Sequence, residues 1–292
     1  MHADELDIDE PLVRRLLAHQ FPHWAELPLQ RVPSSGTDNA LFRLGDDLVV
    51  RLPRRPKGGA SIEHEYEWTP RLGASLPVAV PTPVAKGAPD HGYPATWAVY
   101  VWLEGDNPVP RELTAPLALA RDLARLVRAF LSIELAGPKT RRGAPLTGQD
   151  AGVRKALGEV GDMIDVDAAA AAWEEALAAP NWSAPPRWLH GDLLPFNLLV
   201  REGRLSAVLD FSLVGVGDPA CDLLPAWWLP ADASDAFRLD LRVDDATWAR
   251  GRGWALSMAL IALPYYKETN PLFAANALLM IANILGEANV CS

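Results

Sequence analysis

The sequence predicts an α+β fold with two lobes, a small N-terminal lobe rich in strands and a larger, mainly helical C-terminal lobe. The chain has 292 residues, of which 49% are hydrophobic, so it is long enough to bury two lobes. Strand-like runs dominate up to about residue 104, and helical patterns dominate after it. A chain in which the strands come first and the helices follow is typical of an α+β fold. We therefore expect lobes at residues 1–104 and 105–292.

The first lobe should begin with an amphipathic helix over residues 11–21, because Leu12, Val13, Leu16 and Leu17 follow helical spacing. Polar, turn-forming residues at 33–39 and 45–47 separate the strand-like runs that follow. The further expected elements are strands at 29–32, 40–44 and 48–52, a helix ending near residue 73, an extended proline-rich connector over 76–83, and a buried strand over 96–103.

The second lobe should consist mostly of helices. Leu119, Leu123, Leu126, Val127 and Phe130 form one apolar stripe. The remaining expected elements are a basic loop over 138–148, an alanine-rich helix over 168–179, and helices over 248–263 and 272–285.

Bulk properties limit the classes of function. No apolar run reaches the roughly 18–20 residues of a membrane helix, and the acidic N-terminus lacks the pattern of a secretory signal. The cysteines, Cys221 and Cys291, imply no disulfide framework and suit a reducing cytoplasm. A formal net charge of −10 argues against nucleic acid as a partner and mildly favours a cationic small substrate, although many proteins are acidic for solubility alone.

The stretch 188–200 and the strand after it hold the most informative pattern. His190, Asp192 and Asn197 lie in this stretch, and Asp210 ends the following apolar run. Transfer of a γ-phosphoryl group needs a carboxylate near the attacking hydroxyl and oxygen ligands for Mg²⁺. The pattern therefore predicts Asp192 near the hydroxyl, Asn197 and Asp210 on Mg²⁺, and His190 as a brace of the loop. These residues could instead be ordinary turn formers and caps, but the complete spacing is much rarer than one Asp-x₄-Asn pair.

The N-terminal lobe offers groups for a nucleotide. The small polar turn with Gly36 and Asn39 could lay backbone N–H groups on phosphates. Arg51, in the third strand, could reach the α- and β-phosphates, and Glu65 could pair with it. Gly36 could equally belong to a plain hairpin turn, and Arg51 could be a surface arginine.

Two other patterns are rejected as nucleotide sites. Residues 215–220 match G-x-G-x-x-A, but Asp218 would place a carboxylate where a pyrophosphate must lie. Asp218 instead suits a helix N-cap before Pro219, and Asp222 could tie that helix to the loop of Asp192. Residues 137–140 resemble part of a P-loop but lack its glycines.

With these motifs in place, the sequence resembles the aminoglycoside phosphotransferase family of antibiotic kinases, whose fold is related to protein kinases and choline kinases. The resemblance spans nearly the whole chain in the right order. It is carried by residues 188–200, 207–211, 217–223 and the lobe connector 99–105, with weaker support from 36–44, 49–53 and Glu65.

The resemblance implies a bilobal protein-kinase-like fold that uses ATP and Mg²⁺, with the ATP site between the lobes. It implies Asp192 as catalytic base, Asn197 and Asp210 as Mg²⁺ ligands, and Arg51 as the cation on the phosphates. Adenine is implied to hydrogen-bond to the connector backbone near Tyr100, Val101, Trp102 and Leu103.

The chain departs from the family pattern in three places. Arg51 stands where many members have lysine, and its planar fork is not equivalent to an ammonium group. Ser212 follows Asp210-Phe211 where protein kinases have glycine. Residues 193–196 are more apolar than usual, which could narrow or shield the mouth of the site.

The expected acceptor is a hydroxyl of a small molecule, first an aminoglycoside or another antibiotic. A cleft lined by Trp227, Trp228 and Trp254 would favour a macrolide-like ligand. The sequence is also compatible with a metabolic kinase of choline, homoserine or a sugar, and with a non-catalytic nucleotide-binding module. We expect a monomer or homodimer without a nucleic-acid or membrane partner. Substrate contacts are expected from Asp232, Asp235, Tyr265, Tyr266 and Glu268.

Overall fold

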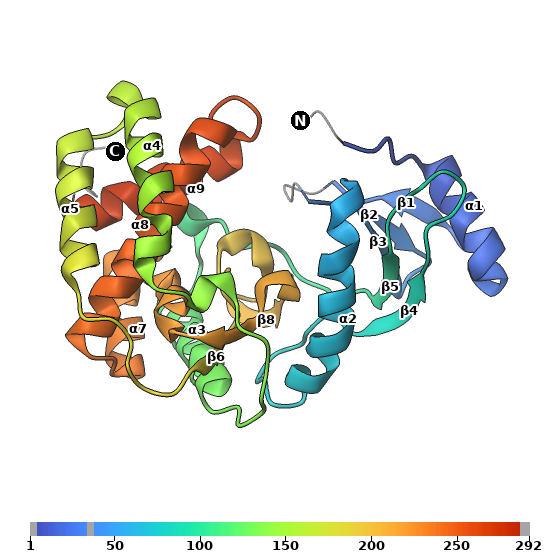
Figure 1. Cartoon of the computed structure of the whole chain (residues 1–292). Coiled ribbons are helices and arrows are strands. Elements are labelled where there is room, and N and C mark those ends of the chain that lie inside the picture. The colour runs from blue at the N-terminus through green and yellow to red at the C-terminus, as the bar shows by residue number, and fades with distance from the viewer. Residues whose placement is uncertain (1–4, 34–37, 287–292) are drawn as a thin grey trace. The chain divides into compact units, whose positions relative to one another are not determined.

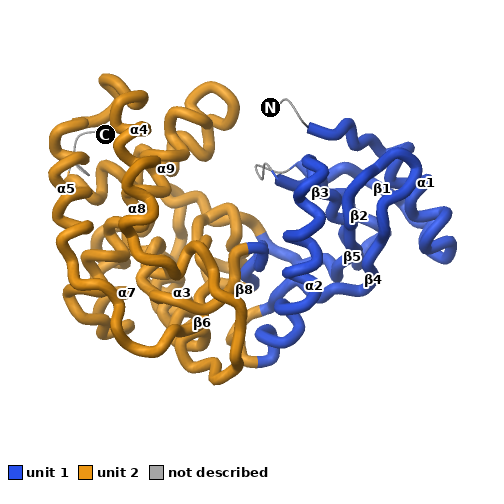
Figure 2. Tube along the Cα trace, in the orientation of Figure 1, with its two compact units in different colours: residues 1–74, 79–105, 207–212 blue, residues 75–78, 106–206, 213–292 orange. Residues whose placement is uncertain are grey.

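The computed structural model describes residues 5–33 and 38–286, and the chain forms two compact units (Figures 1 and 2). Unit 1 comprises residues 1–74, 79–105 and 207–212, and unit 2 comprises residues 75–78, 106–206 and 213–292. A sheet-rich N-terminal region and a helical C-terminal region confirm the predicted fold class. The sequence predicts residues 207–212 in the C-terminal lobe, but they cluster with unit 1.

Unit 1 is built on an antiparallel sheet with strand order β1-β2-β3-β5-β4. Strand β4 is not expected from the sequence, because it is short and begins at a proline with an irregular register. The strands are β1 (Leu29–Arg31), β2 (Asn39–Leu44), β3 (Leu48–Pro53), β4 (Pro83–Gly87) and β5 (Trp97–Val101).

Two helices pack against opposite faces of this sheet. Helix α1 (Glu10–Gln20) contributes Leu16 to a core that includes Phe42 and Val50, whereas α2 (Gly59–Gly73) contributes Ile62 to a cluster with Tyr100. Successive side chains of a strand point to opposite faces. In β3 and β5, every second side chain belongs to the core with α1, and the side chains between them therefore face α2.

Unit 2 is mainly helical, with α8 packed against α4, α5 and α9. Its core includes the fully buried side chains of Phe130, Trp173, Trp188, Trp228 and Trp254. Helices α4 and α7 are not expected from the sequence. The helices are α3 (Pro116–Leu131), α4 (Asp150–Glu159), α5 (Val166–Ala178), α6 (Pro225–Trp228), α7 (Ala231–Leu241), α8 (Asp245–Tyr266) and α9 (Pro271–Leu285).

Four short strands frame the loop of Asp192. Strand β6 (Arg187–Leu189) pairs antiparallel with β9 (Gly215–Gly217), and β7 (Leu198–Arg201) pairs with β8 (Arg204–Val208). After β9, the Asp218 side chain accepts a hydrogen bond from the Ala220 N–H at 3.1 Å, as the predicted N-cap requires. Within the described residues, no helix is both long and apolar enough to cross a membrane.

Candidate active site

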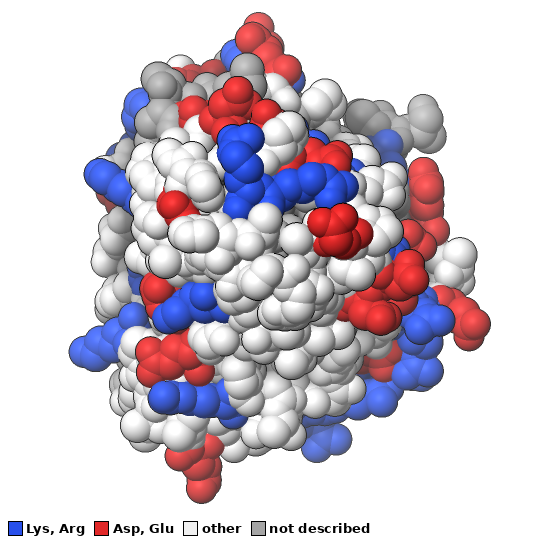
Figure 3. Space-filling view, turned by 90° about the vertical axis from the view of Figure 1, so that its right-hand side faces the viewer, with Lys and Arg blue, Asp and Glu red and all other residues white. Residues whose placement is uncertain are grey.

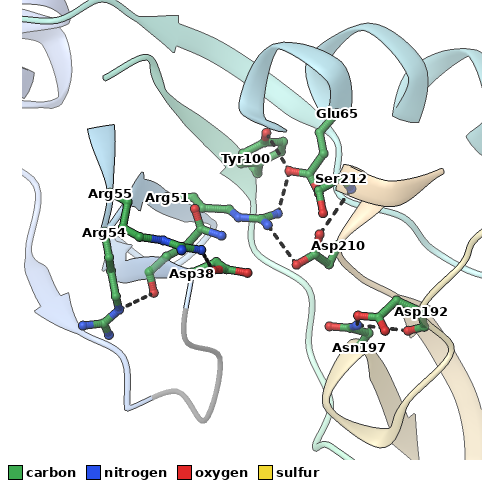
Figure 4. A network of polar contacts seen from close by, with 11 residues as sticks. Asp38, Arg51, Arg54, Arg55, Glu65, Tyr100, Asp192, Asn197, Asp210 and Ser212 are labelled. Carbon is green, nitrogen blue, oxygen red and sulfur yellow. Dashed lines mark hydrogen bonds and ion pairs between the residues drawn. The ribbon is translucent and has the colours of Figure 1, made fainter. Parts of the chain in front are cut away.

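The catalytic loop, defined as residues 190–197, joins β6 to β7 in unit 2. The Asn197 amide nitrogen donates to the Asp192 carbonyl at 3.0 Å and to its Oδ2 at 2.8 Å (Figure 4). The Asp192 N–H donates to Nδ1 of buried His190 at 3.2 Å, which is the bracing bond expected of this histidine. One side of the Asp192 carboxylate is therefore held by Asn197.

The start of the catalytic loop is fixed from within the core. Asp222 is 1% exposed and accepts hydrogen bonds from the His190 N–H at 2.8 Å and the Gly191 N–H at 2.7 Å. Burial raises the pKa of Asp222 to about 6, although His190 and the two N–H groups oppose the rise. The expected tie between Asp222 and the catalytic loop is thus present.

The end of the catalytic loop is fixed by Asn107, whose importance the sequence does not reveal. Its amide nitrogen donates to the carbonyls of Phe196 at 3.1 Å and Leu198 at 2.8 Å. Beside it, Asp106 and Val200 exchange backbone hydrogen bonds. From the sequence, residues 104–108 are only a lobe boundary, because an asparagine in a turn carries no sign of a partner about 90 positions away.

Arg142 is the second residue that the sequence does not indicate. It lies in a short 3₁₀ turn (Arg141–Gly143), inside the segment predicted to be a basic loop. Its Nη2 lies 4.0 Å from Asp192 Oδ1, and its side chain is only 18% exposed. A basic, glycine-bearing segment is usually an exposed loop, so composition alone could not have identified a largely buried cation.

In unit 1, Arg51 is the centre of a polar network between β3 and α2. Its Nη1 donates to Glu65 Oε2 at 2.6 Å, and its Nη2 lies 3.2 Å from Asp210 Oδ2 (Figure 4). With the Asn39 amide oriented so that its oxygen faces the guanidinium, this oxygen accepts from Arg51 Nη2 at 3.0 Å and Nε at 3.1 Å. The Arg51 side chain is 11% exposed, so the interpretation as a surface arginine is wrong.

Charge and burial act against each other in this network. Burial lowers the pKa of Arg51, but the charges of Glu65 and Asp210 outweigh it, and the pKa lies above its ordinary value. Burial raises the pKa of Glu65 to about 7, and Arg51 opposes this rise. Tyr100 donates its hydroxyl to Glu65 at 3.4 Å, and burial raises the pKa of its phenol. Arg51 is therefore a permanent cation whose buried partner is Glu65.

Asp210 follows β8 in a left-handed backbone conformation with φ of +60°. Its Oδ1 accepts from the Ser212 N–H at 3.2 Å, a local bond that suits an Asp in this conformation. The carboxylate of Asp210 and the amide oxygen of Asn197 are hard oxygen ligands of the kind that Mg²⁺ binds, so the donor set fits this ion. Asp210 belongs to unit 1 and Asn197 to unit 2.

Two backbone N–H groups of the connector, which the resemblance implies as the adenine-binding segment, donate to carbonyls of the protein itself. The Val101 N–H donates to the Thr82 carbonyl at 2.9 Å, and the Trp102 N–H donates to the Asp47 carbonyl at 2.7 Å. The Tyr100 side chain belongs to the buried cluster with α2. The next residue of the connector is Leu103. Gly36, predicted to lie in the polar turn near the phosphates, is outside the described residues.

Of the residues expected to contact the acceptor, those at the end of α8 are joined to the catalytic loop by aromatic contacts. Phe196 of the loop stacks on Phe273 of α9, with ring centroids 4.0 Å apart and planes at 10°. Phe273 contacts Tyr266 at 4.8 Å, and Tyr266 contacts Tyr265 at 4.6 Å. Glu268 follows two residues later and is exposed. These four side chains form what we call the aromatic wall: Phe196, Phe273, Tyr266 and Tyr265.

Asp232 and Asp235 are exposed on α7, which packs against α3 and α6. The Asp232 carboxylate accepts from the N–H of Ala233 in its own helix at 2.9 Å. Their assignment to the acceptor stays a prediction.

The tryptophans considered for an apolar cleft belong to the core. Trp227 is 5% exposed, Trp228 is 1% exposed and Trp254 is 0% exposed. The alternative of a macrolide-like cleft lined by these three side chains is therefore not supported, because they are buried in the core.

The G-x-G-x-x-A pattern has a packing explanation. A Cβ on Gly217 would lie 2.4 Å from the Gly143 carbonyl oxygen, and a Cβ on Gly215 would lie 2.7 Å from the Pro138 carbonyl oxygen. Asp218 forms a buried ion pair with Arg250 at 2.6 Å. The glycines therefore allow close backbone approach, and the rejection of a dinucleotide site stands.

The chain is similar to known proteins in sequence and in fold. The sequence matches the phosphotransferase enzyme family over residues 29–254. No individually curated protein matches the chain significantly. Among solved structures, the GDP complex of wild-type aminoglycoside 2′-phosphotransferase-IIIa has a TM-score of 0.75 at 15% identity, covering 96% of this chain and 99% of that one.

Two further structures share the fold. The streptomycin–ATP–APH(2″)-IIa ternary complex has a TM-score of 0.63 at 18% identity, covering 91% of this chain and 93% of that one. The macrolide 2′-phosphotransferase MphH from Brachybacterium faecium, as apoenzyme, has a TM-score of 0.61 at 20% identity, with coverages of 94% and 97%. Since the family match extends over most of the chain, the protein belongs to the phosphotransferase enzyme family, the aminoglycoside-phosphotransferase type of kinase with a protein-kinase-like fold.

Proposed function

We propose that this kinase transfers the γ-phosphoryl group of ATP to a hydroxyl of a small molecule, an aminoglycoside or another antibiotic. The observation that carries the proposal is the catalytic loop, where the Asp192 carboxylate is oriented by Asn197 at 2.8 Å. Asp222 and Asn107 fix the two ends of the same loop through its backbone. A carboxylate held in a fixed orientation is suited to align an acceptor hydroxyl.

In the proposed reaction, the acceptor oxygen bonds to the γ-phosphorus while the bond from that phosphorus to the β–γ bridging oxygen breaks. ADP leaves with the bridging oxygen, and Asp192 accepts the proton of the acceptor hydroxyl. Arg51, held by Glu65, places the α- and β-phosphates. Asn197 and Asp210 would hold Mg²⁺, which when bound supplies positive charge to the phosphate oxygens.

The nucleotide is proposed to bind to the lobe of residues 1–104, with Asn39, Arg51 and Glu65 serving the phosphates. Because the N–H groups of Val101 and Trp102 donate to other backbone carbonyls, we assign the base contacts to the Leu103 peptide and the carbonyls of the connector. One solved relative holds GDP and another holds ATP, so both ATP and GTP belong in the assay.

A macrolide-like acceptor is the second candidate, and the aromatic wall favours it. Phe196 is itself a residue of the catalytic loop that holds Asp192, and its ring stacks on Phe273. Flat aromatic surface packs well against the apolar face of a large lactone or a sugar ring. The exposed carboxylate of Glu268 would instead favour an amine-rich acceptor, and both classes therefore enter the panel.

The test measures Mg²⁺-dependent release of ADP with a panel of acceptors, for the wild type and for Asp192→Asn. The panel holds aminoglycosides, macrolides, peptide antibiotics, choline, homoserine and simple sugars. We expect one class of acceptor to stimulate turnover, and we expect Asp192→Asn to reduce kcat by at least about 10³-fold while nucleotide still binds. Full turnover in Asp192→Asn would remove Asp192 from its proposed role.

The panel also separates the antibiotic kinase from the competing functions. Stimulation by choline, homoserine or a sugar alone would indicate a metabolic kinase with the same mechanism. Nucleotide binding without transfer to any acceptor would favour the non-catalytic module. We further propose that the enzyme acts in the cytoplasm, as a monomer or homodimer.

A further inference from the structure

The segment 137–143, here called the basic strap, lies along β9 beside the catalytic loop within unit 2. The Val216 N–H donates to the Pro138 carbonyl at 2.8 Å, and the Asp218 N–H donates to the Gly143 carbonyl at 2.9 Å. The Thr140 hydroxyl donates to the Leu213 carbonyl at 2.7 Å. The strap, which lies mostly within the predicted basic loop, is therefore held by hydrogen bonds along its length.

The strap lies directly on the catalytic loop. Gly191 has a φ of +84°, and a Cβ at this position would lie 2.9 Å from Cβ and Cγ of Arg142. A side chain at position 191 would displace Arg142, so the glycine that forms the turn of the loop also admits the arginine stem. The position of Arg142 thus follows from close packing of its stem on the loop backbone.

The guanidinium of Arg142 faces the catalytic carboxylate. Its Nη2 is 4.0 Å from Asp192 Oδ1, whereas Asn197 holds the other oxygen, Oδ2. Arg142 Nε is buried and has no hydrogen-bond partner among the residues that the structure describes. The guanidinium carbon lies 5.9 Å from the ring centroid of Trp254. A buried arginine with an unused donor is costly unless that donor serves another state of the protein.

Arg142 differs from a structural ion pair in the same unit. Arg250 binds Asp218 with hydrogen bonds of 2.6 and 3.2 Å, the geometry of a closed pair. The separation of 4.0 Å between Arg142 and Asp192 is beyond hydrogen-bond length, so these two groups attract each other without forming a closed pair. Catalytic contacts of this kind often shorten only when a substrate is bound.

We propose that Arg142 is a positioning residue for phosphoryl transfer, which holds Asp192 Oδ1 in line with the acceptor hydroxyl. This inference rests on the proposed role of Asp192. Asn197 restrains one carboxylate oxygen, and Arg142 restrains the other through its charge and its planar fork. The pair of restraints removes rotation of the carboxylate that would otherwise misalign the hydroxyl.

The experiment compares Arg142→Gln and Arg142→Lys with the wild type, using the acceptor found in the panel. Arg141→Gln is the matched control, because Arg141 is the neighbouring strap residue and its side chain is exposed. We expect Arg142→Gln to lower kcat by about 10- to 100-fold with KM for ATP unchanged within about twofold. Arg142→Lys should recover part of kcat, and Arg141→Gln should match the wild type.

The double variant Asp192→Asn with Arg142→Gln tests whether Arg142 acts through Asp192. If it does, the double variant loses no more kcat than Asp192→Asn alone. Wild-type kcat in Arg142→Gln, or losses that multiply in the double variant, would overturn the proposal. The proposal would also be overturned if both Arg142 variants had a lower melting temperature that accounted for their loss of kcat.

The same assay distinguishes the two proposals. If the phosphotransfer role of Asp192 fails, Asp192→Asn keeps its turnover and both proposals fall together. If only the role of Arg142 fails, Asp192→Asn is inactive while Arg142→Gln retains the wild-type kcat.

Discussion

The position of Arg51 follows from the two-residue period of a strand. Val50 and Leu52 face the core with α1, so Arg51 between them must face α2. On that side it meets Glu65, which is 1% exposed and would otherwise be a buried charge without a cation. A single residue thus links the sheet to its helix.

Arg51→Met should destabilise the protein by about 3–5 kcal/mol, because Glu65 would stay buried without its cation. Urea unfolding at pH 7 measures the free energy of unfolding. Adding Glu65→Gln to Arg51→Met should recover part of the loss, since a neutral amide costs less to bury than a carboxylate. If Arg51→Met unfolds at the same urea concentration as the wild type, the pair contributes no stability.

At the scale of elements, Asp122 joins α3 to β8 within unit 2. It accepts from Arg204 through two hydrogen bonds of 2.7 Å, and Arg125 lies 2.8 Å from it. Burial raises the pKa of Asp122, but the hydrogen bonds and charge of Arg204 outweigh burial and hold the pKa below its ordinary value of 3.8. A carboxyl whose pKa is lower in the folded state stabilises the fold above its unfolded pKa.

Asp122→Asn should therefore lower the free energy of unfolding by about 1–3 kcal/mol at pH 7, the range for hydrogen bonds to charged groups. Arg204 is about half exposed, so solvent screening favours the lower end of this range. The difference from the wild type should begin to shrink as pH falls below 3.8, because the Asp122 carboxyl of the unfolded wild-type chain is then protonated, and it should disappear as pH falls through the lower pKa of the folded state.

Chemical unfolding of both proteins between pH 7 and pH 3 measures this difference. Asp162→Asn is the control, since Asp162 is an exposed acid in the same unit. A stability difference that stays constant over the whole range would contradict the assignment.

At the scale of the whole molecule, the proposed reaction needs side chains of both units. Arg51, Glu65 and Asp210 belong to unit 1, whereas Asp192 and Asn197 belong to unit 2. The net charge is −10, and the face drawn in Figure 3 intersperses acidic and basic side chains, so this face is not specialised for a polyanion. A nucleotide is therefore expected to bind through a few placed cations and Mg²⁺ rather than through a basic surface.

Binding of a non-hydrolysable ATP analogue with Mg²⁺ should raise the melting temperature of the wild type. At a ligand concentration of about 100 times Kd, binding adds about 2.7 kcal/mol to the free energy of unfolding. Asp192→Asn should keep this shift, because Asp192 is proposed to act on the acceptor. Asp210→Ala should lose it, and EDTA should remove it from the wild type. An equal shift in Asp210→Ala would exclude Asp210 as a ligand of the metal.

Local patterns in the sequence predict most of the elements that hold the candidate site. Helices α1 and α3 follow from apolar periodicity and α5 from its alanine content. The sequence also predicts strands β2, β3 and β5 and helices α8 and α9, with boundaries shifted by a few residues. Helices α4 and α7 and strand β4 are not predicted. The proline-rich approach to β4 hides a strand, and these two helices carry many exposed polar residues whose spacing alone does not define a buried stripe.

The sequence by itself determined the family, the loop of His190, Asp192 and Asn197, and the cap formed by Asp218, because spacing along the chain and local hydrogen bonds define these features. Tertiary structure alone decided that Asn107 and Arg142 lie against the catalytic loop and that Phe196 stacks on Phe273. It also decided that Trp227, Trp228 and Trp254 are core residues. The partners in these contacts lie tens of residues apart, and their meeting depends on how whole elements pack rather than on any local pattern.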